Sequence, residues 1–275
     1  MQLEAKALLQ DVPQSRLFDE MLKLLQTGHA LASIAQLKAL GLAKGIYPLL
    51  DIVVERADTA FVKAALADTD RRVGEGKPVA PSFLLACVLW SDVREGWAQR
   101  IARKAHPFPA LQEAIDEVFD SRIGDVSGRG KLGADMREIW MMQPRFEKRM
   151  GSTPFSLAEQ PRFRAGFDFL RLRAEVQEVD ETLADWWQEF SLADDATRED
   201  LMQQARAEQQ AKPRSPRVRR VPKADAAPAS NSADSDHEEA PEQASEPTAE
   251  GEAAPKKRRR RRRKPSGGGA APAAE

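Results

Sequence analysis

The chain has 275 residues, and 42 Lys and Arg residues nearly balance 43 Asp and Glu residues, which gives a formal net charge of −1 at pH 7. Its single cysteine, Cys87, excludes an intramolecular disulfide and lies in an apolar run typical of a buried structural thiol. The first residues lack the pattern of a signal peptide, and the longest apolar run, residues 83–90, is too short to span a bilayer. We therefore expect a cytoplasmic protein.

Nearly all of the first 211 residues show the apolar spacing of helices, and we find no convincing period-two strand pattern. The predicted helices are residues 15–27, 30–40, 46–56, 58–73, 81–90, 92–104, 109–120, 134–149, 161–177, 181–190 and 197–211. Gly and Pro fall between them, most densely from residue 73 to 81. We predict an all-α fold with a first region at 1–73, a second at 74–211, and a tail at 212–275.

The tail has no aromatic residue and is rich in Pro, Ala, Ser and charged residues, so it cannot bury enough apolar surface to offset the entropy of ordering. We predict that it is disordered. From Asp225 to Glu252 every ionised side chain is acidic. Nine adjacent cations follow: Lys256, Lys257, Arg258, Arg259, Arg260, Arg261, Arg262, Arg263 and Lys264. They are predicted to bind polyanions by counterion release, without sequence readout. Nuclear localisation is the competing interpretation for a eukaryotic source.

The predicted helix at 134–149 has an apolar face opposite a cationic one. The apolar residues are Met136, Ile139, Trp140, Met142, Phe146 and Met150, and the cations are Arg137, Arg145, Lys148 and Arg149. The four cations are candidate contacts to a polyanion, with an ordinary solvated face as the alternative. Pro144 lies within this helix and removes one of its hydrogen bonds.

The predicted helix at 161–177 has apolar residues on two opposite faces, which indicates a central helix. Its arginines fall on the two edges between those faces. On one edge the spacing favours the pairs Arg164–Asp168 and Arg171–Glu175. On the other edge Arg162 and Arg173 have no acidic neighbour on the helix, so we predict that they contact phosphates. The same spacing predicts the pairs Arg16–Glu20 and Asp19–Lys23 in the helix at 15–27.

Three patterns that resemble enzyme motifs lack the setting that their chemistry needs. Residues 128–133 match GxGxxG, but no strand precedes them. The pairs Asp68 with Asp70 and Asp234 with Asp236 lie at the end of a predicted helix and in the predicted tail, not in a rigid metal site. The three histidines are scattered along the chain. We therefore predict no catalytic residue, metal site or bound cofactor in this chain.

Several segments together resemble bacterial poly(A) polymerases, the polynucleotide adenylyltransferases (transferases of the nucleotidyltransferase group) related to CCA-adding enzymes. The resemblance covers about residues 8–190, in the family's order. The matching segments include Arg16-Leu-Phe-Asp-Glu-Met-Leu-Lys, Pro81-Ser-Phe-Leu-Leu-Ala, Arg137-Glu-Ile-Trp-Met-Met-Gln, Pro161-Arg-Phe-Arg-Ala-Gly-Phe-Asp and Trp186-Trp.

The resemblance implies a helical neck and an RNA-binding body that guide an RNA 3′ end, without sequence preference, toward an active site. Arg16, Glu20 and Lys23 match the neck motif that abuts the nucleotide pocket of the family. For the full-length family it implies ATP binding, magnesium, and the addition of AMP to RNA 3′ ends. That mRNA processing step promotes RNA decay, so the decay machinery is a further expected partner.

The family's catalytic head precedes the neck, and its Gly-Gly or Gly-Ser turn and Asp-x-Asp pair do not occur in that position here. We expect the chain alone to be inactive and interpret it as a truncated, split or mis-started reading frame. A standalone RNA-binding or regulatory module without transferase activity is the alternative. A helical scaffold with a generic basic tail is a third interpretation.

Overall fold

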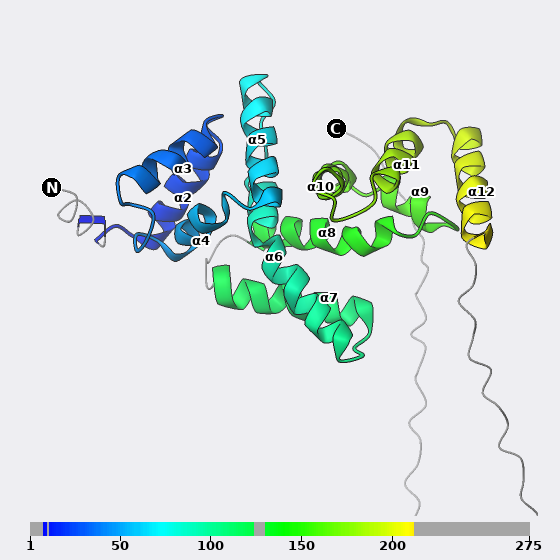
Figure 1. The fold of residues 1–275 in the computed structure, drawn as a ribbon, viewed down its shortest axis with the longest axis horizontal. Coiled ribbons are helices and arrows are strands. Elements are labelled where there is room, and N and C mark those ends of the chain that lie inside the picture. Colours follow the sequence, from blue (N-terminus) through cyan, green and yellow to red (C-terminus); the bar gives the residue numbers. More distant parts are fainter. Residues whose placement is uncertain (1–7, 10, 124–129, 212–275) are drawn as a thin grey trace, which may run out of the picture. The chain divides into compact units, whose positions relative to one another are not determined.

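The structure is a computed structural model that describes residues 8–9, 11–123 and 130–211 (Figure 1). Within these residues it contains α-helices and one π-helical turn but no strand, which confirms the predicted all-α fold. The elements are α2 (Gln14–Leu25), α3 (Ala30–Ala39), α4 (Pro48–Arg56), α5 (Ala60–Gly74), α6 (Pro81–Ala102), α7 (Pro107–Val118), η1 (Phe119–Ile123), α8 (Gly130–Phe146), α9 (Thr153–Ala158), α10 (Phe163–Glu175), α11 (Glu181–Leu192) and α12 (Asp195–Ala211). No helix in the described ranges has the length and apolar character that crossing a membrane requires.

The helix boundaries differ from the prediction in three places. The segments predicted at 81–90 and 92–104 form one helix, α6, which continues through the polar residue that begins the second segment. This residue, Asp92, accepts hydrogen bonds from Arg56 at 2.6 Å and from Arg122 at 3.0 Å. The short helix α9 was not predicted, and α8 begins four residues earlier than expected. The predicted disordered tail lies outside the described residues.

The first half of α6 is buried on every side. Every residue from 82 to 90 is buried, and Cys87 has only 1% of its surface exposed, as predicted from its apolar surroundings. Burial raises the pKa of the Cys87 thiol well above its ordinary value, because the thiolate loses its hydration. A helix without a polar face is typical of the centre of a helical core.

The buried side chains form two hydrophobic clusters, and α10 contributes to both. Phe169 and Leu172 belong to the larger cluster, which extends from residue 18 to residue 172. Phe167 and Leu170 belong to the smaller cluster, which extends from residue 142 to residue 201. This arrangement confirms the prediction that α10 is buried on two sides. The larger cluster also joins residues from both sides of the predicted boundary at 73/74, and that boundary stays a prediction.

The backbones of α8 and α10 approach each other closely at Gly166. A Cβ atom at this position would lie 2.6 Å from Met142 Sδ, too close for two packed atoms. Gln143 Nε2 donates across the same contact to the carbonyl oxygen of Gly166 at 3.2 Å. Pro144, which lies within α8 as predicted, follows directly. The glycine therefore sets the distance between the two helices.

Candidate nucleic-acid interface

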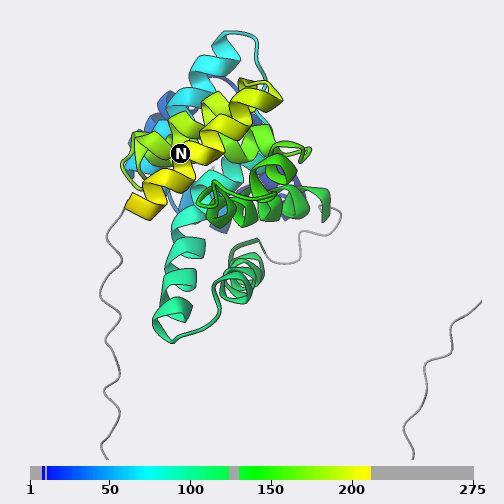
Figure 2. The ribbon, with the colours of Figure 1, turned by 90° about the vertical axis from the view of Figure 1, so that its right-hand side faces the viewer.

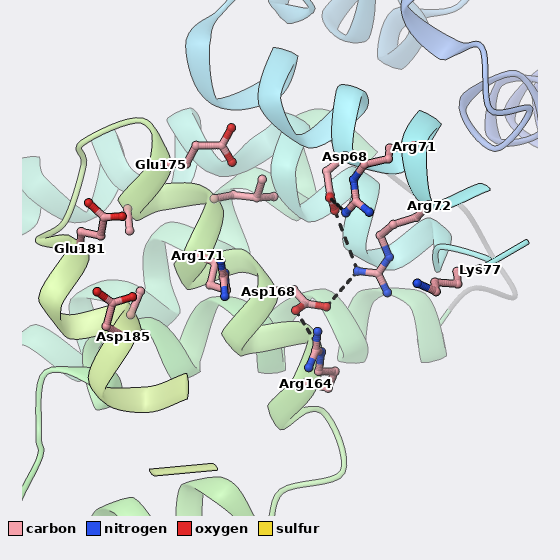
Figure 3. Close-up of a pocket in the computed structure, with 13 residues that line it drawn as sticks. Asp68, Arg71, Arg72, Lys77, Arg164, Asp168, Arg171, Glu175, Glu181 and Asp185 are labelled. Atoms are coloured by element: carbon pink, nitrogen blue, oxygen red, sulfur yellow. Dashed lines mark hydrogen bonds and ion pairs between the residues drawn. The ribbon is translucent and has the colours of Figure 1, made fainter. Parts of the chain in front are cut away.

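A pocket of about 650 Å³ lies between α5, α10 and α11 (Figure 3). Ten of its lining residues carry charge. The cations are Arg71, Arg72, Lys77, Arg164 and Arg171, and the acids are Asp68, Asp168, Glu175, Glu181 and Asp185. Figure 3 shows that Arg71, Arg72 and Lys77 gather on one side, whereas Glu175, Glu181 and Asp185 lie on the other. Asp68 and Asp168 contact the cations. We call Arg71, Arg72, Lys77 and Arg164 the cationic wall, and Glu175, Glu181 and Asp185 the acidic wall.

The end of α5 places the cationic wall. Arg71 and Arg72 occupy the last turn of α5, where positive charge complements the helix dipole. Gly76 follows with a φ of 76°, and Lys77 N–H donates to the carbonyl oxygen of Arg72 at 2.8 Å. This glycine turn reverses the chain and brings Lys77 back to the rim of the pocket.

Asp168 joins the cationic wall to α10. Arg72 Nη1 donates to Asp168 Oδ2 at 3.0 Å, and Arg164 Nε lies 3.0 Å from Asp168 Oδ1. The second contact confirms the predicted Arg164–Asp168 pair. One carboxylate is therefore shared by two guanidinium groups, and Arg72 Nη1 also lies 4.0 Å from Asp68 Oδ2. The Arg164 side chain is 73% exposed, so its remaining N–H groups face solvent.

Arg72 also holds a donor that the protein does not satisfy. Its Nε atom is buried and, within the described residues, has no hydrogen-bond partner. Leaving a buried donor unpaired costs about 1–3 kcal/mol, so native proteins retain few of them. The side chain of Arg72 is thus held at the pocket by Asp168 with one donor unpaired within the described part of the chain.

The rim of the cationic wall carries a second set of ion pairs. Arg71 contacts Asp68 and, at 2.8 Å, Glu75, while Lys77 Nζ lies 2.8 Å from the same Glu75 carboxylate. The hydrogen bonds from Lys77 and Arg71 lower the pKa of Glu75, and those to Asp68 and Glu75 raise the pKa of Arg71. These groups stay ionised near neutral pH, and Arg71 and Lys77 remain more than half exposed.

The prediction of an Arg171–Glu175 pair is wrong. Arg171 Nη1 donates instead to Gln188 Oε1 on α11, at 3.1 Å. The spacing of four residues allows Arg171 and Glu175 to meet on α10. Gln188 of the neighbouring helix α11 binds Arg171 instead. Arg171 therefore lines the pocket and does not form an ion pair within α10.

The cations predicted on the helix at 134–149 have varied surroundings. Arg137 contacts Asp116 and lies over the Phe119 ring, with its Cζ atom 5.2 Å from the ring centre. Arg149 contacts Glu208 at 3.2 Å, and Lys148 Nζ lies 5.8 Å from the centre of the Phe108 ring. Among the described contacts, Arg145 forms no ion pair. Their role as phosphate contacts stays a prediction.

Among the described contacts, Arg162 and Arg173 have no acidic partner on α10, as predicted, but each pairs with an acid outside that helix. Arg162 Nη2 lies 2.7 Å from Asp135 Oδ1 on α8. Arg173 Nε lies 3.4 Å from Glu178, and the Arg173 side chain is only 12% exposed. Loss of hydration lowers the pKa of Arg173, an effect that Glu178 opposes. Both acids lie outside α10, so a helical wheel could not show them. The Arg173 side chain is thus largely enclosed, and its contact to phosphate stays a prediction.

Neither ion pair predicted in the helix at 15–27 is found among the described contacts. Lys23 Nζ binds Glu20 Oε1 at 2.9 Å, across three residues instead of four. The expected placement of Arg16, Glu20 and Lys23 beside a nucleotide pocket stays a prediction. The nine cations at 256–264 lie outside the described residues.

The first Asp-x-Asp pair is occupied by structural contacts. Asp70 accepts from Ala30 N–H at 2.8 Å and from Leu31 N–H at 3.3 Å, and so caps the start of α3. Asp68 contacts Arg71. Within the described residues no group of three or more His, Cys, Asp or Glu side chains is placed to hold a metal ion.

Sequence reasoning missed three residues of the cationic wall, Arg71, Arg72 and Lys77. A signal was available, because two adjacent arginines end a predicted helix and a lysine follows two glycines. What the sequence did not show is that α10 packs beside this helix end.

Two family models match the chain. The model described as "Probable RNA and SrmB-binding site of polymerase A" matches residues 3–53, and the model described as "Polymerase A arginine-rich C-terminus" matches residues 103–221. Asp68, Arg72 and Lys77 lie between the two matched stretches, whereas Arg164 and Asp168 lie in the second.

Curated relatives agree with these models. Poly(A) polymerase I of Haemophilus influenzae is 36% identical over 210 residues, which cover 73% of this chain and 46% of the relative. The protein of the same name from Salmonella typhi is 36% identical, with coverage of 66% and 41%, and that from Escherichia coli O157:H7 is 34% identical, with coverage of 68% and 42%. The chain spans less than half the length of these relatives.

Proposed function

Since the chain belongs to the poly(A) polymerase family and carries its RNA-binding and arginine-rich regions, we propose that the pocket between α5, α10 and α11 holds RNA. The observation that carries this proposal is the shared carboxylate of Asp168, which presents Arg72 and Arg164 together on one wall. We further propose that the whole polymerase extends the 3′ end of this RNA with AMP, which it takes from ATP in the presence of magnesium. This step would belong to the cytoplasmic mRNA processing that leads to decay.

The chemistry of the cationic wall suits the phosphates of an RNA backbone. A guanidinium group that gives one N–H to a carboxylate can offer its other N–H groups to phosphate oxygens in a planar fork. Arg164 is the most exposed of these groups, and Lys77 adds a mobile ammonium at the rim. The acidic wall across the pocket repels phosphate and so confines the backbone to the cationic side.

Contacts of this kind position a nucleic acid without reading its sequence. The proposed RNA binding is therefore independent of sequence and falls steeply with salt, because each phosphate contact releases counterions. This agrees with a role in holding 3′ ends of many different RNAs.

Salt-dependent RNA binding by the full chain tests the pocket. Affinity for a single-stranded RNA oligonucleotide is measured by fluorescence anisotropy over a series of salt concentrations. The double variant Arg164→Ala with Lys77→Ala removes two exposed cations of the pocket. We expect affinity to fall by about tenfold and the salt slope to decrease by about 1.4, at ~0.7 per lost contact.

Lys63→Ala is the matched control for this experiment. Lys63 is an exposed lysine of the same helix, α5, and does not line the pocket. It should leave affinity and slope close to those of the wild type. If the double variant binds RNA as the wild type does, the pocket is not an RNA site.

A primer-extension assay separates this proposal from a catalytic one. The 275-residue chain is incubated with ATP, magnesium and an RNA primer. We expect it to bind the primer without extending it, because Asp68 and Asp70, which form an Asp-x-Asp pair, are engaged in structural contacts. Extension of the primer would show that the chain carries catalytic residues not identified in the pocket.

A further inference from the structure

A second cationic surface lies at the turn between α6 and α7, which form a helical hairpin (Figures 1 and 2). The turn comprises Arg103, Lys104, Ala105 and His106, and all four residues are exposed. No acidic residue occurs in the sequence between Glu95 and Glu113. In the described part of the chain neither Arg103 nor Lys104 forms an ion pair, unlike most arginines of the pocket. Their charges are therefore available to a ligand.

Lys104 adopts an unusual backbone conformation for a lysine. Its φ is 65°, in the left-handed region that favours glycine. The hydrogen bonds from Lys104 N–H to Ile101 at 2.8 Å and from Ala105 N–H to Arg100 at 3.1 Å end α6 in a motif that commonly carries glycine at this position. Elsewhere in this structure the chain turns at glycines with positive φ, such as Gly41 and Gly76. A lysine at this position is strained, and residues with such strain cluster at functional sites.

An aromatic ring lies beside the turn. Phe108, in the first turn of α7, is half-buried, and Lys148 Nζ lies 5.8 Å from the centre of its ring. Trp97 Nε1 donates to the carbonyl oxygen of Pro107 at 2.9 Å and so fixes the start of α7 against α6. The hairpin thus holds the cations and the ring in a defined arrangement.

We propose that this surface, defined by Arg103, Lys104, Phe108 and Lys148, is a second RNA contact that binds single-stranded RNA. The proposal rests on the proposed RNA-binding function and adds a site outside the pocket. The cations bind backbone phosphates, and an unpaired base stacks against Phe108. A cationic surface beside a partly exposed aromatic ring is an arrangement that proteins use for single strands, because every base presents a stacking face. Duplex RNA offers no unstacked base to the ring.

Lys104→Gly separates binding from folding. Glycine relieves the left-handed strain, so the melting temperature should rise by about 2–4 °C. RNA affinity should nevertheless fall about threefold, and the salt slope should decrease by about 0.7, because one phosphate contact is lost. A stabilised variant with unchanged affinity would show that Lys104 has no part in RNA binding and would overturn the proposal.

Gln177→Gly is the matched control. Gln177 is the one other non-glycine residue with positive φ in the described ranges, and it ends α10 with the same hydrogen-bond pattern. This variant should also raise the melting temperature, while its RNA affinity and salt slope should stay those of the wild type.

Phe108→Leu tests the stacking contact. Leucine keeps an apolar side chain but removes the aromatic face, so affinity for a single-stranded oligonucleotide should fall roughly fivefold, with the salt slope unchanged. Competition by duplex RNA of the same length should be weak. Equal competition by the duplex would overturn the assignment to single strands.

The same assays distinguish failure of this proposal from failure of the proposed function. If the wild-type chain does not bind RNA, both fail. If it binds and the pocket variants weaken binding while Lys104→Gly and Phe108→Leu do not, only the second contact is overturned.

Discussion

Two enclosed carboxylates, one just after α10 and one within it, each hold two arginines. Glu178, just after α10, contacts Arg94 at 2.5 Å and Arg173 at 3.4 Å. Asp168, within α10, contacts Arg72 and Arg164 at 3.0 Å each. The two carboxylate side chains are almost equally enclosed, with 14% and 13% of their surface exposed.

The arginines on these carboxylates differ in exposure, and exposure decides whether a guanidinium group can reach a ligand. Arg173 is 12% exposed and lies over the Trp90 ring, whose Nε1 atom donates to Glu178 at 3.0 Å. Arg173 also donates to Gln143, so it is held by several protein groups, whereas Arg94 on the same carboxylate is 51% exposed. Arg164 is 73% exposed and borders an open pocket. Enclosure of the acid alone therefore does not indicate a structural pair; the exposure of its cation decides what the pair can do.

The largest expected effect follows from removing Glu178. Glu178→Ala leaves the enclosed guanidinium of Arg173 without compensation and should lower the free energy of unfolding by about 3 kcal/mol. RNA affinity per folded molecule should not change. Urea denaturation measures the loss, and Glu189→Ala, at an exposed position of α11, should cost less than about 0.5 kcal/mol. A loss below about 1 kcal/mol for Glu178→Ala would mean that the network contributes little to stability.

A smaller effect is expected where α8 and α10 meet. Gly166→Ala places a Cβ atom against Met142, which is buried, and we expect a loss of about 1–2 kcal/mol despite the better helix propensity of alanine. Gly74→Ala is the control, because a Cβ atom at that position meets nothing within 4 Å. If both variants are equally stable, the core accommodates the methyl group by moving Met142.

Asp168→Asn should act mainly on binding. Neutralising the shared carboxylate frees donors of Arg72 and Arg164, so RNA affinity should rise about threefold, at a stability cost of about 1 kcal/mol. Glu199→Gln, at an exposed site outside the pocket, should leave affinity unchanged. Weaker RNA binding by Asp168→Asn would show that the carboxylate positions the arginines for binding and does not merely compete with phosphate.

The smallest effect concerns Glu75 at the rim. Its pKa is lowered by Lys77 and Arg71, so these contacts stabilise the folded chain above the ordinary glutamate pKa of about 4.3. That stability is lost as the pH falls through the lowered pKa. Urea midpoints of the wild type and Glu75→Gln should therefore differ slightly at pH 7 and converge toward pH 3. A difference that persists at pH 3 would have another cause.

Among the described contacts, helical spacing gave one of the four ion pairs that it predicted within a helix. The spacing of Arg164 and Asp168, four residues apart, gave the correct pair, and the apolar faces of α10 gave its position between two clusters. The merged α6 was not predicted, because polar residues follow the apolar run that ends at Trp90. The contacts of Asp92 with Arg56 and Arg122 come from other elements and are not visible in the local sequence.

The sequence by itself determined the helices, the central place of α10 and the burial of Cys87, because periodicity and composition act over a few turns of one chain segment. Tertiary structure alone decided the partners and the exposure of the arginines. Arg173 is enclosed by Glu178 and Trp90. Arg72, by contrast, contacts Asp168, which lies 96 positions later in the sequence. The partner and exposure of a charged side chain depend on which helices pack beside it, and that information does not lie in the spacing of residues on its own helix.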